Sequence, residues 1–353
     1  MSAGRSPGTE IIMYGPRGMG KTVLLNWLEN EVEKTAQDNR PLRTVQSTPT
    51  IFPSLKSLWN KLISDDWKKK LWPNQIELGA GGNKIVWNSK APDDDDLVSA
   101  LIEECKERPV VLLMDEAHTM DSRFCQGLLN ISQQARQNAP FLLVLAGTPG
   151  LSHFLTTVNA SFVERSKKMG IARLEAQATA DAIVKPLDAD GVHIAADALE
   201  HVVEDSQHYP YFIQLWGEAL WDVAKEKDLQ KLTSQEIAEV ETKIENRRSN
   251  FYGERRNTLD ELELLPAAVA IATVFQDTET TTRATLIDVI ADNLPADSHA
   301  TQSVNEHLQT LARHEFIWNP PDTDLYEAGI PSLMRYVLDR QREHVQKASP
   351  AAE

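Results

Sequence analysis

The sequence predicts an α/β protein with a doubly wound parallel sheet in its N-terminal half and mostly helices after it. Two apolar runs, 110–114 and 141–146, suit strands that are buried on both faces. Helical patterns separate the strands, and this alternation is the order of a parallel sheet with helices on both sides. From residue 179 the patterns are helical until a short hairpin near the end of the chain. We therefore expect a core domain at 1–176, a helical lid with a connecting helix at 177–258, a winged helix-turn-helix at 259–346 and a tail at 347–353.

Composition places the chain among globular proteins and limits its partners. It has 353 residues, 25% charged and 41% hydrophobic, with a net charge of −16. The negative charge opposes binding to nucleic acid or to anionic membranes, so a DNA contact would need a local basic patch. No run of about 18 apolar residues predicts a membrane span, and the first residues lack signal-peptide order. We expect a cytoplasmic protein without a membrane partner. Its two cysteines, Cys105 and Cys125, have no C-x-x-C spacing and are interpreted as small buried apolar residues.

The core elements follow one another along the chain. We expect strands at 10–14, 42–47, 110–114, 141–146 and 170–174, and helices at 22–33, 54–70, from 93 onward and at 122–138. Glycines between two short apolar runs predict a hairpin insertion at 75–88. The four acids at 93–96 favour a helix N-terminus, where the macrodipole attracts negative charge, over a metal site.

The C-terminal half divides into a lid and a second small domain. Helices are expected to start at Thr179, Ala195, Pro210 and Ser234, and the charged stretch 233–248 suits a solvated connecting helix. Further helices are predicted at 267–274, 282–293 and 303–314, followed by a hairpin of 316–318 with 325–327. Three helices and a two-stranded wing predict a winged helix-turn-helix.

The loop after the first strand has the composition of a phosphate-binding loop. It reads Gly15-Pro16-Arg17-Gly18-Met19-Gly20-Lys21-Thr22, and Val23 follows it in the first helix. The glycines let backbone N–H groups face a β-phosphate, and the helix offers its positive end. We expect Lys21 to reach the β- and γ-phosphates and the Thr22 hydroxyl to ligate Mg²⁺. Because the motif follows a strand and opens a helix, it predicts a P-loop NTPase, and residues 15–23 are the candidate site for ATP or ADP.

Two carboxylates follow the buried strand at 110–114. Asp115 is expected to hold Mg²⁺ through water, and Glu116 is placed to act as general base on an attacking water. A strand end that two acids merely cap is the alternative. His118 completes the letters D-E-A-H of one helicase group, but the second arginine-rich helicase motif does not appear in the C-terminal half. We interpret His118 as a supporting or surface residue.

Three further residues complete the predicted catalytic set and its alternatives. Thr148 ends the strand expected between the two motif strands, where a hydroxyl can orient the water or touch the γ-phosphate; otherwise it caps the next helix. Arg165 is a candidate arginine finger for a neighbouring subunit's γ-phosphate, and Arg173 is a second candidate. Each arginine is equally a candidate for an ordinary surface residue.

These motifs together resemble AAA+/STAND-like P-loop ATPases of the archaeal-type or origin-initiator-like group. The matching segments are 15–22, 110–116, 142–149 and the helix that follows 208–214, which is similar to the lid motif G-x-P of that group. The resemblance implies ATP hydrolysis with Mg²⁺, a sensor role for Thr148 and a C-terminal winged helix. Three features depart from the pattern. The upstream adenine-binding segment of that group is not found in these residues, so either the start is truncated or adenine is held differently. His208 replaces a glycine, and Tyr211 stands where a sensor arginine is expected. The choice of ATP over GTP therefore rests on the resemblance, and slow turnover suits this chain better than a processive motor.

Three functions are compatible with these residues. The first is an ATP-gated switch that relays its state through the winged helix to a protein partner or to self-association. The second is a DNA-binding initiator, loader or transposition-type ATPase, but residues 260–353 hold 16 acidic and 6 basic residues, and the presumed recognition helix at 301–313 is a poor phosphate-contacting surface. The third is a scaffold that binds nucleotide without hydrolysis, which leaves Glu116 without a purpose.

Overall fold

The computed structural model describes residues 9–39, 43–62, 94–293, 301–320 and 323–348. The hairpin predicted at 75–88 lies outside these residues. The chain divides into two compact units, one formed by residues 1–14 and 21–169 and the other by residues 15–20 and 170–353. In the described part of the chain, no helix is both long and apolar enough to cross a membrane.

A five-stranded sheet in the order β2-β3-β4-β1-β5 forms the centre of the first unit. Its strands are β1 (Ile11–Tyr14), β2 (Arg43–Ser47), β3 (Val110–Met114), β4 (Phe141–Gly147) and β5 (Lys167–Gly170). The pairs β1–β4, β3–β4 and β2–β3 are parallel, and every residue of β3 is buried. The predicted doubly wound parallel sheet is confirmed, including a strand, β4, between the two motif strands.

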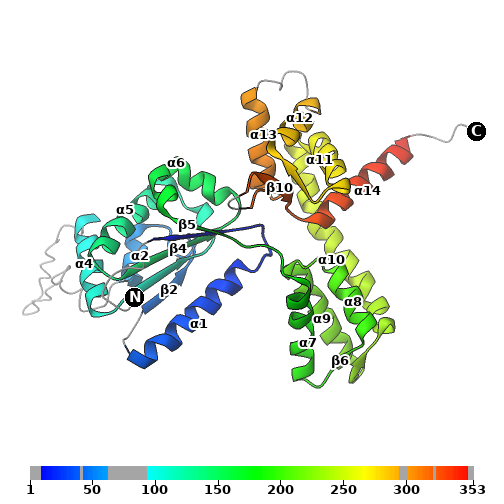
Figure 1. Ribbon diagram of the computed structural model, residues 1–353, viewed down its shortest axis with the longest axis horizontal. Coiled ribbons are helices and arrows are strands. Elements are labelled where there is room, and N and C mark those ends of the chain that lie inside the picture. Colours follow the sequence, from blue (N-terminus) through cyan, green and yellow to red (C-terminus); the bar gives the residue numbers. More distant parts are fainter. Residues whose placement is uncertain (1–8, 40–42, 63–93, 294–300, 321–322, 349–353) are drawn as a thin grey trace, which may run out of the picture. The chain divides into compact units, whose positions relative to one another are not determined.

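Helices cover both faces of this sheet. They are α1 (Lys21–Asn39), α2 (Leu55–Leu62), α4 (Asp94–Glu107), α5 (Ser122–Asn138) and α6 (Gly150–Arg165), with a 3₁₀ turn η1 (Ala117–Thr119) after β3. In Figure 1, α1 lies on one face and α4, α5 and α6 lie on the other. Asp121 begins α5 by accepting the N–H groups of Arg123 and Phe124, which are free of helical partners at a helix start.

A buried ion pair fixes the start of β1. The Glu10 carboxylate is 3% exposed and accepts hydrogen bonds from Arg136 Nη1 at 3.1 Å and from Ser132 Oγ at 3.2 Å, both on α5. Removing one partner of such a pair typically costs about 3–5 kcal/mol, because the other charge stays buried. The strand that leads into the glycine loop is therefore held at its beginning.

The expected fifth strand begins three residues earlier than predicted and ends four residues earlier. Apolar residues predicted it at 170–174, whereas β5 spans Lys167–Gly170 and the Lys167 N–H donates to the Glu10 carbonyl. Half-buried Ile171 instead lies against Gly15, where an added Cβ would stand 2.7 Å from the Ile171 carbonyl oxygen. The apolar pattern at 170–174 thus reflects packing beyond the strand and was wrong as a strand prediction.

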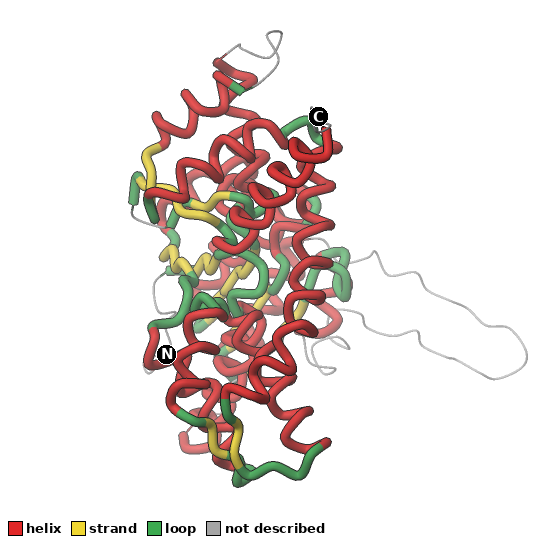
Figure 2. Tube along the Cα trace, turned by 90° about the vertical axis from the view of Figure 1, so that its right-hand side faces the viewer, coloured by secondary structure: helices red, strands yellow, loops and turns green. Residues whose placement is uncertain are grey.

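The second unit is largely helical, as the red tube in Figure 2 shows. Its first part contains α7 (Ala176–Ala189), β6 (His193–Ile194), α8 (Ala196–Asp205), α9 (Pro210–Glu226), β7 (Lys231–Leu232) and α10 (Ser234–Glu261). The parallel pair β6–β7 was not predicted from the helical patterns. Thr233 and Glu236 form a capping box at the start of α10, which continues well beyond the charged stretch because its later residues Tyr252 and Leu259 are buried.

The last part of the second unit contains the predicted three helices and hairpin. Its elements are α11 (Leu265–Asp277), β8 (Thr280–Thr282), α12 (Arg283–Asp292), α13 (Thr301–Arg313), β9 (Ile317–Trp318), β10 (Leu325–Ala328) and α14 (Pro331–Ala348). The antiparallel pairs β8–β10 and β10–β9 make a three-stranded sheet, so one strand joins the predicted hairpin. We call residues 265–348 the C-terminal segment.

Candidate nucleotide-binding site

Oxygen ligands meet where β3 ends and α1 begins. The Thr22 hydroxyl donates to Asp115 Oδ2 at 2.5 Å, and Asp115 is 4% exposed. The other carboxylate oxygen accepts the Glu116 N–H at 2.8 Å, and the Asp115 N–H donates to the Ser47 carbonyl at the end of β2. A buried carboxylate beside a hydroxyl is a hard-oxygen pair of the kind that Mg²⁺ prefers, so these residues fit that cation.

The glycine loop adopts the backbone that phosphate binding requires. Gly18 and Gly20 have φ angles of 81° and 83°, which residues with a Cβ rarely adopt. A Cβ at Gly20 would meet no atom within 4 Å, so the space beside this residue is open. Lys21 is 6% exposed at the first position of α1, and Val23 is 68% exposed two residues further on. The described loop therefore fits a phosphate group, as the motif predicts.

Glu116 stands after Asp115 in a left-handed backbone conformation. Its φ and ψ are 50° and 32°, a region that costs a non-glycine residue about 1 kcal/mol or more. The peptide is held there because the Glu116 carbonyl accepts both the N–H and the hydroxyl of Thr119. The Glu116 carboxylate is 41% exposed and therefore accessible to water.

The imidazole of His118 lies between Glu116 and the end of β4. Its Nδ1 accepts the Thr148 N–H at 3.4 Å, and its Nε2 lies 3.4 Å from Glu116 Oε2. Thr148 itself is 3% exposed. The structure thus brings three residues of the sequence analysis together: the predicted base, the predicted sensor, and the histidine interpreted as a supporting or surface residue.

Within the second unit, the tip of the glycine loop is held by three hydrogen bonds. The Arg17 N–H donates to Glu315 Oε1 at 2.9 Å, and the Tyr209 hydroxyl donates to the Arg17 carbonyl. The Tyr211 N–H donates to the Gly18 carbonyl at 3.0 Å. Burial and the nearby Glu315 carboxylate raise the pKa of the Tyr209 hydroxyl well above its usual range, so it stays a donor. The loop tip is therefore contacted by the start of α9 and by the turn after α13.

Close packing accompanies these hydrogen bonds. A Cβ at Gly18 would stand 2.8 Å from Tyr211 Cβ and 3.0 Å from Tyr209 Cε1, so only glycine fits. His208, where the lid motif favours glycine, has a φ of 58°, which explains that preference, and its Nδ1 lies 3.0 Å from Thr179 Oγ1. Tyr211 replaces the expected sensor arginine and stacks on Phe251 with ring centroids 5.0 Å apart.

Glu315 is a functional candidate that the sequence analysis missed. It is 3% exposed, and its φ of 62° places a charged residue in the left-handed region. Gly329 closes over it, since a Cβ there would come 1.9 Å from the Glu315 carbonyl oxygen. Arg255 Nη2 lies 3.7 Å from Glu315 Oε2, and the Arg255 guanidinium lies 3.7 Å from the Phe251 ring centroid. No local sequence pattern predicts the contact of Glu315, because its partner Arg17 is 298 positions away.

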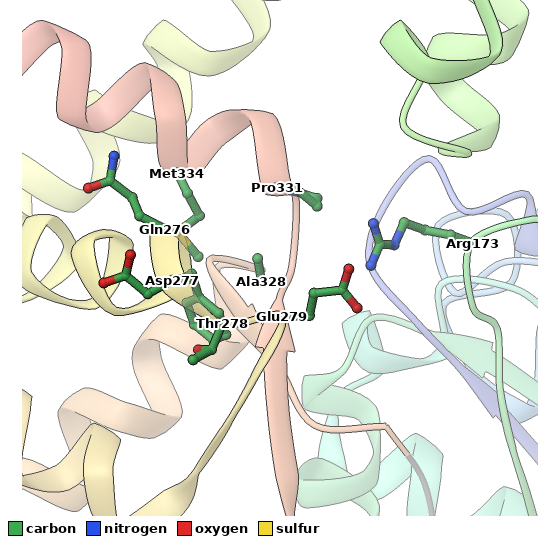
Figure 3. Close-up of a pocket in the computed structure, with 9 residues that line it drawn as sticks. Arg173, Gln276, Asp277, Thr278, Glu279, Ala328, Pro331 and Met334 are labelled. Atoms are coloured by element: carbon green, nitrogen blue, oxygen red, sulfur yellow. The ribbon is translucent and has the colours of Figure 1, made fainter. Parts of the chain in front are cut away.

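The two arginine-finger candidates have partners of different kinds. Arg165 ends α6 and donates to Gln133 Oε1 at 3.4 Å, in an exposed position. Arg173 lines a cavity of about 280 Å³ with the end of α11 and the start of α14. Figure 3 shows its guanidinium and the Glu279 carboxylate pointing toward one another across this cavity. Both finger assignments remain predictions.

Taken residue by residue, these features are those expected of P-loop nucleotide-binding proteins: a glycine loop, a hydroxyl–carboxylate pair that fits Mg²⁺, and a carboxylate that is accessible to water. Comparison with known families agrees, because residues 6–155 match the family described as AAA domain. This match and the parallel sheet agree with a P-loop NTPase fold in this part of the chain.

Two solved structures show this fold along most of the chain. The ORC2 protein of Aeropyrum pernix in ADPNP–ADP complexes has a TM-score of 0.56 and 11% identity, covering 97% of this chain and 90% of that one. The ADP form of the same protein gives a TM-score of 0.55 and 13% identity, covering 94% and 88%. At these identities the likeness concerns the fold alone. A search of curated proteins by sequence finds no match.

Proposed function

We propose that this chain is a nucleotide-dependent switch that hydrolyses ATP with Mg²⁺ and relays the state of its nucleotide to a protein partner through the C-terminal segment. One observation carries the proposal: the loop that would contact the phosphates is also hydrogen-bonded, through Arg17 and Gly18, to Tyr209, Tyr211 and Glu315. A conformational change of the loop on nucleotide binding would therefore alter its hydrogen bonds to these three residues. A switch needs contacts that differ between its two states, and these contacts to the loop are the ones proposed to change.

Hydrolysis follows from the residues at the ends of β3 and β4. Lys21 and the N–H groups of the loop would bind the phosphates, and Glu116 would take the proton of a water that attacks the γ-phosphorus. The bond between the γ-phosphorus and the bridging oxygen breaks, the electron pair leaves with ADP, and the proton passes from Glu116 to solvent or phosphate. Thr148 would orient the water or the γ-phosphate. Mg²⁺, held by Thr22 and through water by Asp115, would neutralise the charge of the phosphates.

The tyrosine at the expected sensor-arginine position supports a slow switch. Tyr211 has no positive charge to place on a γ-phosphate and is instead stacked on Phe251. An arginine acting on the transition state is worth several powers of ten in rate in related phosphoryl transfers. Turnover without one on the lid suits a timer better than a motor, unless a second subunit supplies Arg165.

The partner is proposed to be a protein, either another molecule or a second copy of this chain. The acidic excess of residues 260–353 disfavours phosphate contacts. In the presumed recognition helix, the Asn305 side chain already accepts a hydrogen bond from Arg283 at 2.6 Å. Binding to DNA through the winged helix remains the alternative, and it predicts an affinity that falls steeply with added salt.

The proposal is tested by two variants with separate expected results. Lys21→Ala should abolish binding of a fluorescent ATP analogue, whereas Glu116→Gln should bind ATP and keep only a small residual turnover. Light scattering on Glu116→Gln, with ATP and Mg²⁺, with ADP and without nucleotide, then asks whether ATP drives self-association. Hydrolysis at the wild-type rate in both variants would contradict the site assignment. An ATP-specific oligomer would support a finger such as Arg165, and a monomer in all three states would favour another protein as partner.

A further inference from the structure

We propose that His118 is a positioning residue that joins the general base Glu116 to the sensor end of β4, so that base and sensor act as one unit. The proposal deepens the proposed hydrolysis and rests on it. It starts from two contacts of one ring: Nδ1 to the Thr148 N–H and Nε2 to the Glu116 carboxylate, each 3.4 Å.

The contact with β4 selects the tautomer of the ring. A backbone N–H can only donate, so Nδ1 must offer a lone pair to Thr148. In a neutral imidazole the hydrogen is then on Nε2, the atom that faces Glu116 Oε2. The Thr148 peptide thus makes His118 a donor to the carboxylate, in the way that a hydrogen bond on one ring nitrogen sets the role of the other.

The His118 ring is held more firmly by its surroundings than the Glu116 carboxylate is. The His118 side chain is 16% exposed, against 41% for Glu116. Its Nδ1 edge lies over Gly147, where an added Cβ would stand 3.1 Å away, so the last residue of β4 leaves room for the imidazole. A half-exposed glutamate has several rotamers within reach of solvent, and a donor on a fixed ring reduces their number.

The backbone supports the same reading. Glu116 is held in the left-handed region, directly before the turn η1 that carries His118. Strain of this kind persists where surrounding contacts enforce it, and it gathers at functional sites. The two side chains are thereby brought to the same side of a tight turn, where the carboxylate can be aimed while the ring stays against β4.

The decisive experiment is a double-mutant cycle on steady-state ATP hydrolysis by the full chain. His118→Ala should lower kcat about 10- to 100-fold, the range for losing a hydrogen bond to a charged group. The Kd for a fluorescent ATP analogue should change less than about twofold, because His118 is not among the loop residues. In a Glu116→Gln background the same change should cost nothing further, since the residue acts through the base. Additive losses would overturn the proposal.

Conservative variants separate positioning from packing. His118→Gln can place an amide N–H near the Nε2 position, whereas His118→Asn keeps only an acceptor near Nδ1. The glutamine variant should therefore retain more kcat than the asparagine variant, and the reverse order would contradict the assignment. His153→Gln, at an exposed histidine of α6, is the matched control and should leave kcat unchanged.

A spectroscopic readout keeps the test independent of hydrolysis. The ¹⁵N shifts of His118 should report an unprotonated Nδ1 and a protonated Nε2, and the Nε2 signal should move in Glu116→Gln. A ring with its hydrogen on Nδ1, or one indifferent to Glu116, would overturn the proposal. A chain that binds ATP and never hydrolyses it would instead remove the proposed hydrolysis, while the shifts still decide the contact.

Discussion

Replacing Glu315 by glycine or by glutamine tests whether the C-terminal segment holds the tip of the glycine loop. The wild-type carboxylate is buried and accepts the Arg17 N–H at 2.9 Å. A hydrogen bond to a charged group is worth about 1.5–3 kcal/mol, against about 0.5–1.5 kcal/mol for a neutral pair. Glutamine should therefore weaken the contact by about 1 kcal/mol. Glycine removes the acceptor but relieves about 1 kcal/mol of left-handed backbone strain, for a net loss of about 0.5–2 kcal/mol.

Hydrogen exchange read by mass spectrometry measures this loss directly. A change of about 0.5–2 kcal/mol corresponds to roughly 2- to 30-fold faster opening, which should appear in the peptide that contains Arg17. If the contact relays nucleotide state, wild type should also exchange differently with ADP and with an ATP analogue at residues 311–318. That difference should shrink in Glu315→Gly.

Glu263 provides the matched control for backbone strain. It has a φ of 57° and an exposed side chain, so Glu263→Gly relieves the same kind of strain without touching the loop. The reasoning would be refuted if Glu315→Gly left exchange at Arg17 unchanged, or if Glu263→Gly accelerated it equally.

Two further results are expected. Gly18→Ala should destabilise the fold by about 2–4 kcal/mol, because an alanine here would have a left-handed backbone and its Cβ would clash with Tyr211. The control Gly217→Ala, in open space on α9, should be neutral or stabilising. Thermal unfolding of both variants measures the difference. Burial and the nearby Arg313 and Arg17 charges lower the pKa of His314 from 6.5. Protonation of His314 then favours the unfolded chain, so the free energy of unfolding should be highest above pH 6.5 and fall as the pH drops below that value. Urea titrations at several pH values measure this dependence. A His314→Gln variant should lack it.

The sequence was sufficient to predict the parallel sheet, and it also indicates the candidate phosphate site, because both rest on local patterns. The glycine loop between a strand and a helix, and two carboxylates after a fully buried strand, each lie within ten residues. Their placement follows from parallel-sheet topology, and the observed pairing agrees. Even the strand between the motif strands could be anticipated, since Thr148 ends the next apolar run.

Contacts between residues far apart in the sequence could not be predicted from local patterns. Tyr209 and Glu315 reach the loop from positions 192 and 298 residues away from Arg17. Glu315 carries no pattern of its own, and its left-handed backbone depends on Gly329 closing over it. His118 could be read from the D-E-A-H sequence, but its proposed role depends on its packing against Gly147, which has no side chain and lies 29 positions further along the chain. The pair β6–β7 has only two residues per strand, too few for an alternating pattern.

The division of the chain into compact units limits how the segment that carries the glycine loop can be separated from the rest of the chain. Residues 15–20 group with residues 170–353, although the strand before them and the helix after them belong to the other unit. A fragment that ends near residue 169 would keep every residue of the glycine loop and lose Tyr209, Tyr211 and Glu315. Residues 6–155, which match the AAA model, are therefore not expected to function when they are transferred alone. Grafting them onto another C-terminal half would preserve the motif while discarding the residues that shape it, so the loop and residues 170–353 are expected to vary together in evolution.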